Sequence, residues 1–210
     1  MSTFKIEREK IIEGLFPEFY WEELELPKYQ EVLEQLTRIE QLSSEVVDRL
    51  KNKKVRIGFH KQYKSGAGWT VLRNITLAPG AKLSDNLTLC LISHELFHLQ
   101  QSIWMRLSVK GELLAWQYQQ KAYHELTGND IGDRGQAYAG TKEYWDQLAL
   151  LSANSRDDLL AAQGLMKKVS PDYRSDCLPL FPLAKEIAYL LKQGKLAEAF
   201  RAVWNLITCR

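Results

Sequence analysis

Residues 87–99 have the sequence LTLCLISHELFHL, the longest apolar stretch of the chain. A serine, a glutamate and two histidines interrupt this stretch, so it is too short and too polar to span a bilayer. Such a composition is typical of a helix that is buried on most sides. Ser84 or Asp85 can cap this helix, and we expect it to run to about Leu107.

The chain before this helix predicts a small sheet. Apolar and polar or small residues alternate over residues 54–59, which indicates a half-buried strand. A Gly-Ala-Gly sequence at 66–68 precedes a second predicted strand at 69–72, and an Arg-Asn turn leads to a third at 75–77. The sequence therefore predicts about three strands directly ahead of the buried helix.

Helices are predicted on both sides of this region. Before it, apolar positions recur at every third or fourth residue from Tyr29 to about Lys53, and a shorter helix ends at Gly14. The helices predicted after it are 112–126 and 141–153, one from 155, one from 182 and one after 194, with a polar glycine-rich loop at 128–140.

These patterns place the chain in the α+β class. We expect a mainly helical protein with a small mixed or antiparallel sheet of about three strands, packed on the buried helix. The expected organisation is one compact domain, with an N-terminal helical region (1–53), a core region (54–127) and a C-terminal helical region (128–210).

The buried helix carries the motif HExxH, formed by His94, Glu95, Leu96, Phe97 and His98. Residues four apart on a helix project from the same face, so both histidines can bind one zinc ion. The glutamate is close enough to act as general base for a water molecule that attacks a carbonyl group. Two buried histidines that only make hydrogen bonds are the alternative, and the context of the motif makes zinc the favoured interpretation.

A catalytic zinc ion needs a third protein ligand, which must come from farther along the chain. We favour Glu112, because a short turn makes its helix an antiparallel neighbour of the motif helix. The alternative role for Glu112 is that of a first-turn glutamate favoured by the helix dipole. His124 competes as ligand, Asp130 and Asp133 are weaker candidates, and His60 suits a surface or cleft-edge position at the end of a strand.

The order of strand, turn, strand and HExxH helix resembles the zincin metallopeptidases. It is closest to their gluzincin branch, in which a glutamate of the next helix completes the zinc site, and to minimal domains of the SprT-like kind. The resemblance covers about residues 54–127 and implies one zinc ion bound by His94, His98 and Glu112, with Glu95 as general base. It also implies that an edge strand pairs with an extended peptide; the residues of that strand would be Trp69, Thr70, Val71 and Leu72.

The chain departs from the thermolysin-like pattern at Trp116, where those enzymes place an aspartate that orients a ligand histidine. Substitutes for that aspartate are Asn74, Gln100 and Gln101. No single residue is indicated as the stabiliser of the oxyanion. The candidates for that role are Tyr118, Tyr123, His124, Tyr138 and Tyr144.

Composition limits the classes of partner. Lys and Arg total 28 against 26 for Asp and Glu, so we expect neither a nucleic acid nor a membrane as partner. Three cysteines, at 90, 177 and 209, form no CxxC pair, which favours reduced thiols over a disulfide framework. Residues 1–14 are charged and lack an apolar signal region, so a cytoplasmic protein is expected.

The sequence thus predicts a zinc-dependent metallohydrolase, specifically a metallopeptidase that acts on a peptide or protein substrate. One alternative is a zincin-fold binding or regulatory protein with little or no turnover. Another is a helical interaction protein without a metal ion.

Overall fold

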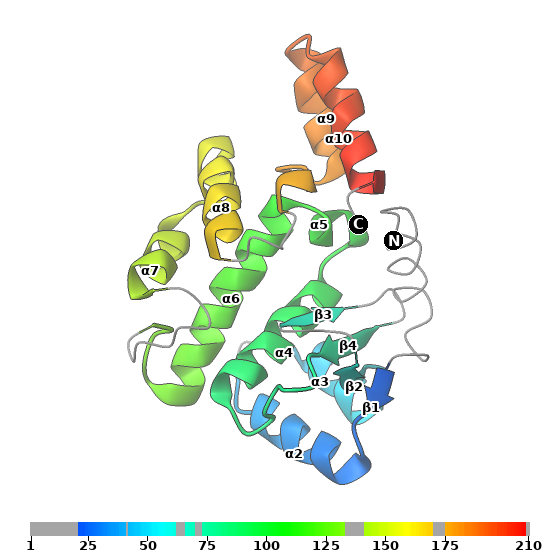
Figure 1. The fold of residues 1–210 in the computed structure, drawn as a ribbon, viewed down its shortest axis with the longest axis vertical. Coiled ribbons are helices and arrows are strands. Elements are labelled where there is room, and N and C mark those ends of the chain that lie inside the picture. The colour runs from blue at the N-terminus through cyan, green and yellow to red at the C-terminus, as the bar shows by residue number, and fades with distance from the viewer. Residues whose placement is uncertain are drawn as a thin grey trace. The chain divides into compact units, whose positions relative to one another are not determined.

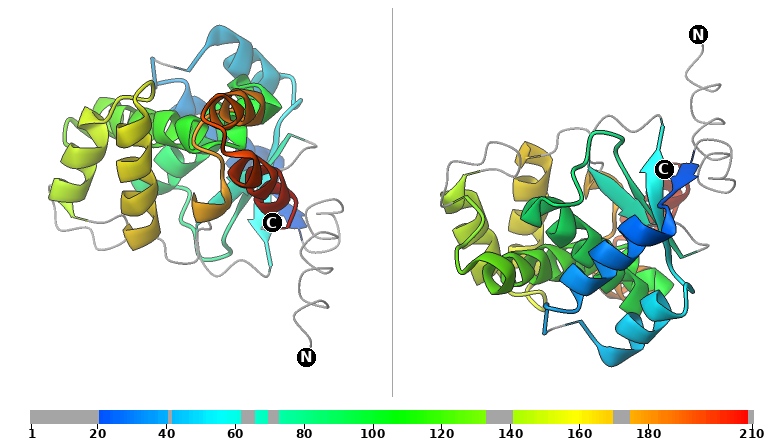
Figure 2. Two further views of the ribbon diagram at one scale, coloured as in Figure 1. Left: turned by 90° about the horizontal axis from the view of Figure 1, so that it is seen from above. Right: turned by 90° about the horizontal axis from the view of Figure 1, so that it is seen from below.

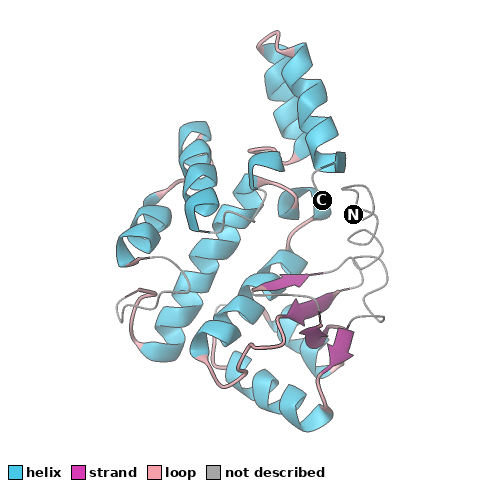
Figure 3. Ribbon diagram, in the orientation of Figure 1, coloured by secondary structure: helices cyan, strands magenta, loops and turns pink. Residues whose placement is uncertain are grey.

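A computed structural model describes residues 21–40, 42–61, 66–69, 73–132, 141–169 and 175–208. Within these ranges the chain forms α-helices and one small sheet, which confirms the α+β class (Figures 1 and 3). The strands are β1 (Trp21–Glu23), β2 (Arg56–His60), β3 (Ala67–Trp69) and β4 (Asn74–Leu77). The helices are α2 (Leu26–Leu36), α3 (Ser44–Lys51), α4 (Asn86–Gln100), α5 (Ile103–Arg106), α6 (Val109–Thr127), α7 (Lys142–Leu150), α8 (Arg156–Val169), η3 (Ser175–Cys177), α9 (Leu183–Lys192) and α10 (Leu196–Thr208).

Within the described residues, the sheet has four strands in the order β1-β2-β4-β3. The central pair β2 and β4 is parallel, whereas β1 and β3 pair antiparallel to their neighbours. Strand β1 was not predicted, because it is only three residues long and mostly exposed, without an apolar alternation. Gly58 permits its close approach, since a Cβ atom there would lie 2.5 Å from the carbonyl oxygen of Glu22.

The single helix predicted from Tyr29 to Lys53 is wrong, because the structure has two helices there, α2 and α3. Ile39 and Leu42 in the connection are buried, so they continue the apolar periodicity without being helical. Ser43 then starts α3, and its hydroxyl oxygen accepts a hydrogen bond from the backbone N–H of Val46.

The motif helix α4 has the burial that its sequence predicts, since 11 of its 15 residues are buried. It ends at Gln100, earlier than expected. Ser102 caps the separate short helix α5, accepting a hydrogen bond from the N–H of Met105. The next helix, α6, begins at Val109 and not at residue 112.

The chain divides into two compact units, residues 1–100 with 121–129 and residues 101–120 with 130–210. In the first unit the sheet and α4 contribute to the core, with Ile57, Ile75, Leu77 and Ile92 fully or almost fully buried. In the second unit Trp145 and other apolar residues of α7 and α8 are buried. Helices α9 and α10 of this unit pack side by side (Figure 2).

Tyr29 makes the stability of the first unit sensitive to alkaline pH. Its hydroxyl group lies 2.7 Å from the carbonyl oxygen of Val55 and 3.0 Å from that of Leu50, so it donates to buried acceptors. Burial raises the pKa of Tyr29 from 10.0 to about 12, and the charge of Glu23 adds to this shift. The folded state therefore favours the protonated phenol. This contribution is complete below the unfolded pKa and is lost as the pH rises through the folded pKa.

We expect titration of Tyr29 to lower the free energy of unfolding by about 3 kcal/mol in total as the pH rises through the unfolded and then the folded pKa. Urea unfolding at a series of alkaline pH values measures this loss. The Tyr29→Phe variant should start less stable, because it lacks the buried hydrogen bonds, but should lose less stability over the same range. Equal pH slopes for the two proteins would contradict the assignment.

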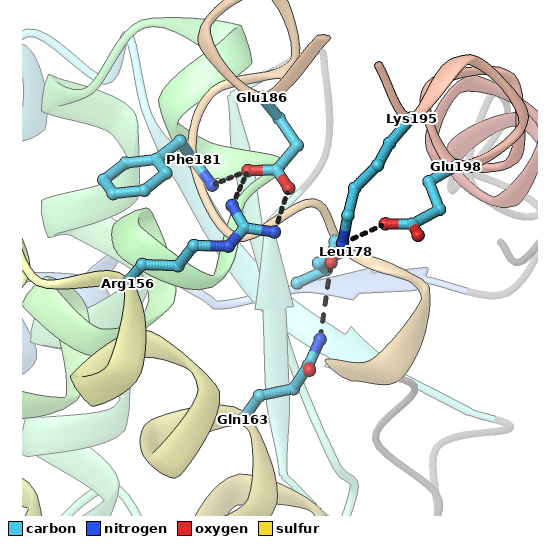
Figure 4. A network of polar contacts seen from close by, with 7 residues as sticks. All are labelled: Arg156, Gln163, Leu178, Phe181, Glu186, Lys195 and Glu198. Carbon is cyan, nitrogen blue, oxygen red and sulfur yellow. Dashed lines mark hydrogen bonds and ion pairs between the residues drawn. The ribbon is translucent and has the colours of Figure 1, made fainter. Parts of the chain in front are cut away.

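Arg156 and Glu186 join α8 to α9 in the second unit (Figure 4). The guanidinium group donates to both carboxylate oxygens of Glu186, at 3.0 and 2.8 Å, and the Phe181 N–H lies 3.4 Å from one of them. Glu186 is buried, and the guanidinium group also lies 4.3 Å from the centre of the Tyr189 ring. The pair thus fixes the start of α9 against α8.

The Glu186→Gln variant should be destabilised by about 2 kcal/mol, because the paired charge is lost at a largely buried position. Chemical denaturation of both proteins measures this difference. Asp176→Asn is the matched control, since it disrupts the exposed Lys167–Asp176 pair and should cost less than about 1 kcal/mol. Equal losses of stability in the two variants would show that the Arg156–Glu186 pair contributes no more to stability than the exposed pair.

Two expectations about thiols and membranes can be compared with the structure. Cys90 is free and buried, as expected, whereas Cys177 is disulfide-bonded, so the expectation of reduced thiols is wrong for that residue. Cys209 lies outside the described residues, as do the helix expected before Gly14 and most of the glycine-rich loop at 128–140. Among the described helices, none combines the length and the apolar character needed to cross a bilayer.

Candidate metal centre

Helix α4 brings the two motif histidines together. Asp85 starts the helix, with its side chain accepting from the N–H of Leu87. His94 and His98 are only 6% and 1% exposed, and their Nε2 atoms lie 3.1 Å apart. Two nitrogen ligands of a tetrahedral zinc ion are separated by about 3.3 Å, given Zn–N bonds of about 2.0–2.1 Å. The two imidazoles therefore have nearly the spacing that a shared zinc ion requires.

Glu112 completes a group of three possible ligands. It lies in the first turn of α6, it is buried, and one ligand atom from each of His94, His98 and Glu112 lies within 4.8 Å of the others. Nitrogen donors from two histidines and an oxygen donor from a glutamate match a catalytic zinc site, which keeps one position open. By donor chemistry, burial and proximity, these side chains fit one zinc ion.

The remaining ligand candidates do not join this group within the described part of the chain. His124 is exposed, and Asp130 forms an ion pair with Lys142 at 3.7 Å. Asp133 lies outside the described residues. His60 ends strand β2 as expected, but it is buried, so the expected surface position is wrong.

Glu95 follows the first histidine on α4 and is 7% exposed. Its carboxylate is therefore removed from bulk water, beside the ligand candidates along the helix. A buried carboxylate next to a metal site can accept a proton from a water molecule held there.

Strand β3 lies at an edge of the described sheet, but it begins at Ala67 and so includes residues 67 and 68, which were predicted to precede the strand. In the described sheet it is the last strand and pairs only with β4. The ring of Trp69, at the end of β3, has its centre 6.4 Å from that of the His98 ring. The other three predicted substrate residues, Thr70, Val71 and Leu72, lie outside the described residues.

Trp116 has a packing role in the second unit. Its ring stacks on that of Trp145, with a centroid distance of 5.4 Å, and contacts Tyr144 edge-on at 6.1 Å. Tyr144 is buried, and burial raises the pKa of its phenol. Both Trp116 and Tyr144 therefore belong to an aromatic cluster of the core.

The suggested partners of the ligand histidines have different surroundings. Gln100 is exposed, and Asn74 accepts a hydrogen bond from Arg56 at 3.3 Å. Gln101 donates to the carbonyl oxygen of Gly111 at 3.1 Å. Of the tyrosines, Tyr118 and Tyr123 are buried on α6. Tyr138 lies outside the described residues.

The contact between Gln101 and Gly111 was not predicted, although it adjoins Glu112. The sequence signal for it is a glycine directly before a candidate ligand in the first turn of a helix.

Comparisons of the chain with protein-family models, with curated proteins and with solved structures found no match.

Proposed function

We propose that this protein is a zinc-dependent metallopeptidase. The observation that carries the proposal is the buried group of His94, His98 and Glu112, whose ligand atoms lie within 4.8 Å of one another. The HExxH motif places Glu95 directly beside this group. The resemblance to gluzincins, which have the same ligand types in the same order, supports the same function.

A zinc ion at these three ligands would acidify a water molecule and polarise a substrate carbonyl group. His94 and His98 would hold the ion through their Nε2 atoms, and Glu112 would hold it through a carboxylate oxygen. Glu95 would accept the proton of the attacking water and donate it to the leaving amine.

The edge position of β3 supports an extended peptide as substrate. A peptide backbone can add to the edge of a sheet through main-chain hydrogen bonds, which depend little on the side chains of the peptide. Trp69 lies at this edge and near His98, so a peptide bound there would pass beside the ligand group.

The test is to measure zinc content and peptide hydrolysis on the same preparation of the full chain, purified without a histidine tag. We expect about one zinc ion per chain and cleavage of some members of a quenched fluorogenic peptide library. A chelator should abolish cleavage, and added zinc should restore it. Protein without zinc would overturn the proposal.

A second candidate function is metal-dependent peptide binding without turnover. Trp116 stands where thermolysin-like enzymes have an aspartate that orients a ligand histidine, and its ring packs in an aromatic cluster. This departure favours the second function. A full equivalent of zinc without any cleavage across the library would support this second function and exclude the first.

A further inference from the structure

The segment between α4 and Glu112 is held by its own hydrogen bonds. The side-chain amide of Gln101 donates to the carbonyl oxygen of Gly111 at 3.1 Å. The carbonyl oxygen of Gln101 accepts from the Nε atom of Arg106 at 3.0 Å. Gln101 is thus fixed through both its side chain and its main chain, three residues after His98 and directly after α4.

Gly111 allows the start of α6 to lie against α5. A Cβ atom at this position would come within 1.9 Å of the carbonyl oxygen of Met105 and 3.2 Å of the Oε1 atom of Gln101. Every other residue type is therefore excluded without a shift of the backbone. Glycine in a helix costs about 1 kcal/mol relative to alanine, so its presence here is explained by this close approach.

The N–H groups at the start of α6 donate to fixed acceptors in the protein. The N–H groups of Val109 and Lys110 donate to the carbonyl oxygens of Pro179 and Leu180, at 2.9 and 3.0 Å. The N–H of Gly111 lies 3.1 Å from the hydroxyl oxygen of Ser108, which is fully buried. The N–H groups that a helix normally leaves unsatisfied at its start are therefore bound to protein atoms.

From these contacts we infer that Gln101 and Gly111 form a clamp that positions Glu112 for metal binding. This inference rests on the proposed function. The clamp joins the residue that follows the motif helix to the residue that precedes the third ligand. A ligand on a fixed helix start loses little conformational entropy when it binds a metal ion, which favours tight binding. Gln101 is thus a positioning residue, acting through Gly111 on Glu112.

The test compares Gln101→Met with Gln100→Met. Methionine keeps the length of the side chain but has no N–H donor, and Gln100 is the exposed neighbour of Gln101. Zinc affinity is measured by competition with a chromophoric chelator, and the ligand geometry by the visible absorption of the cobalt(II)-substituted protein. We expect Gln101→Met to bind zinc roughly 10- to 100-fold more weakly, with altered cobalt bands. Gln100→Met should match the parent protein.

Gly111→Ala is a second variant, which should weaken zinc binding at least as much, because its Cβ atom displaces the turn. The melting temperature of each metal-free variant separates positioning from folding. A lower melting temperature with unchanged zinc affinity would overturn the clamp. Unchanged affinity of Gln101→Met would overturn the clamp alone, whereas a parent protein that binds no zinc would overturn the proposed function as well.

Discussion

Peptide hydrolysis by the Glu95→Gln variant is expected to fall by roughly 10²- to 10⁴-fold, while the variant keeps its zinc ion. Glutamine has the shape of glutamate but cannot accept a proton from the attacking water. Glu95 is buried on α4 and is not one of the three proposed ligands, so its replacement leaves the donor set intact. The measurement is kcat/KM for a cleaved peptide, together with zinc content of the same sample.

Glu34→Gln is the matched control for this experiment. Glu34 is an exposed residue of α2, so the same change of charge there should alter kcat/KM by less than about twofold. Undiminished hydrolysis by Glu95→Gln would remove Glu95 from the role of general base. Loss of zinc by this variant would instead make Glu95 a structural part of the metal site.

The parts of the fold that depend on local patterns were predictable. The start of helix α4, the β2 strand and the α8 start at Ser155 each follow from apolar spacing or capping within a few residues, whereas the end of α4 was predicted seven residues too late. The HExxH motif is also local, because one helical turn determines the distance between His94 and His98. Prediction succeeded where the relevant contact lies within one helix or strand.

Features that depend on contacts between distant residues were not predictable. Strand β1 has no pattern of its own and forms by pairing with β2, where Gly58 leaves room for it. The break between α2 and α3 is hidden by buried Ile39, which has the spacing of a helical residue. The Gln101–Gly111 contact likewise depends on how the chain turns between α4 and α6.

Glu112 lies between these two cases. The sequence indicated it because its helix follows α4 after a short turn, but spacing alone did not separate a ligand from a first-turn glutamate. The structure places its carboxylate in one buried group with both histidines, whereas a glutamate that served only the helix dipole could face water. Metal binding by this group is the prediction that remains to be measured.

Replacing Glu112 with glutamine should weaken zinc binding by roughly 10²- to 10³-fold, because a neutral amide is a poor zinc ligand and each ligand of a zinc site contributes several kcal/mol. The same substitution therefore leaves zinc bound when it is made at Glu95 and weakens zinc binding when it is made at Glu112. Zinc affinity by chelator competition measures the difference, and Glu34→Gln again is the control. Equal zinc affinity of Glu112→Gln and the parent protein would exclude Glu112 as third ligand. The metal ion would then be held by the two histidines and a different group. In that case the clamp formed by Gln101 and Gly111 would have no ligand to position.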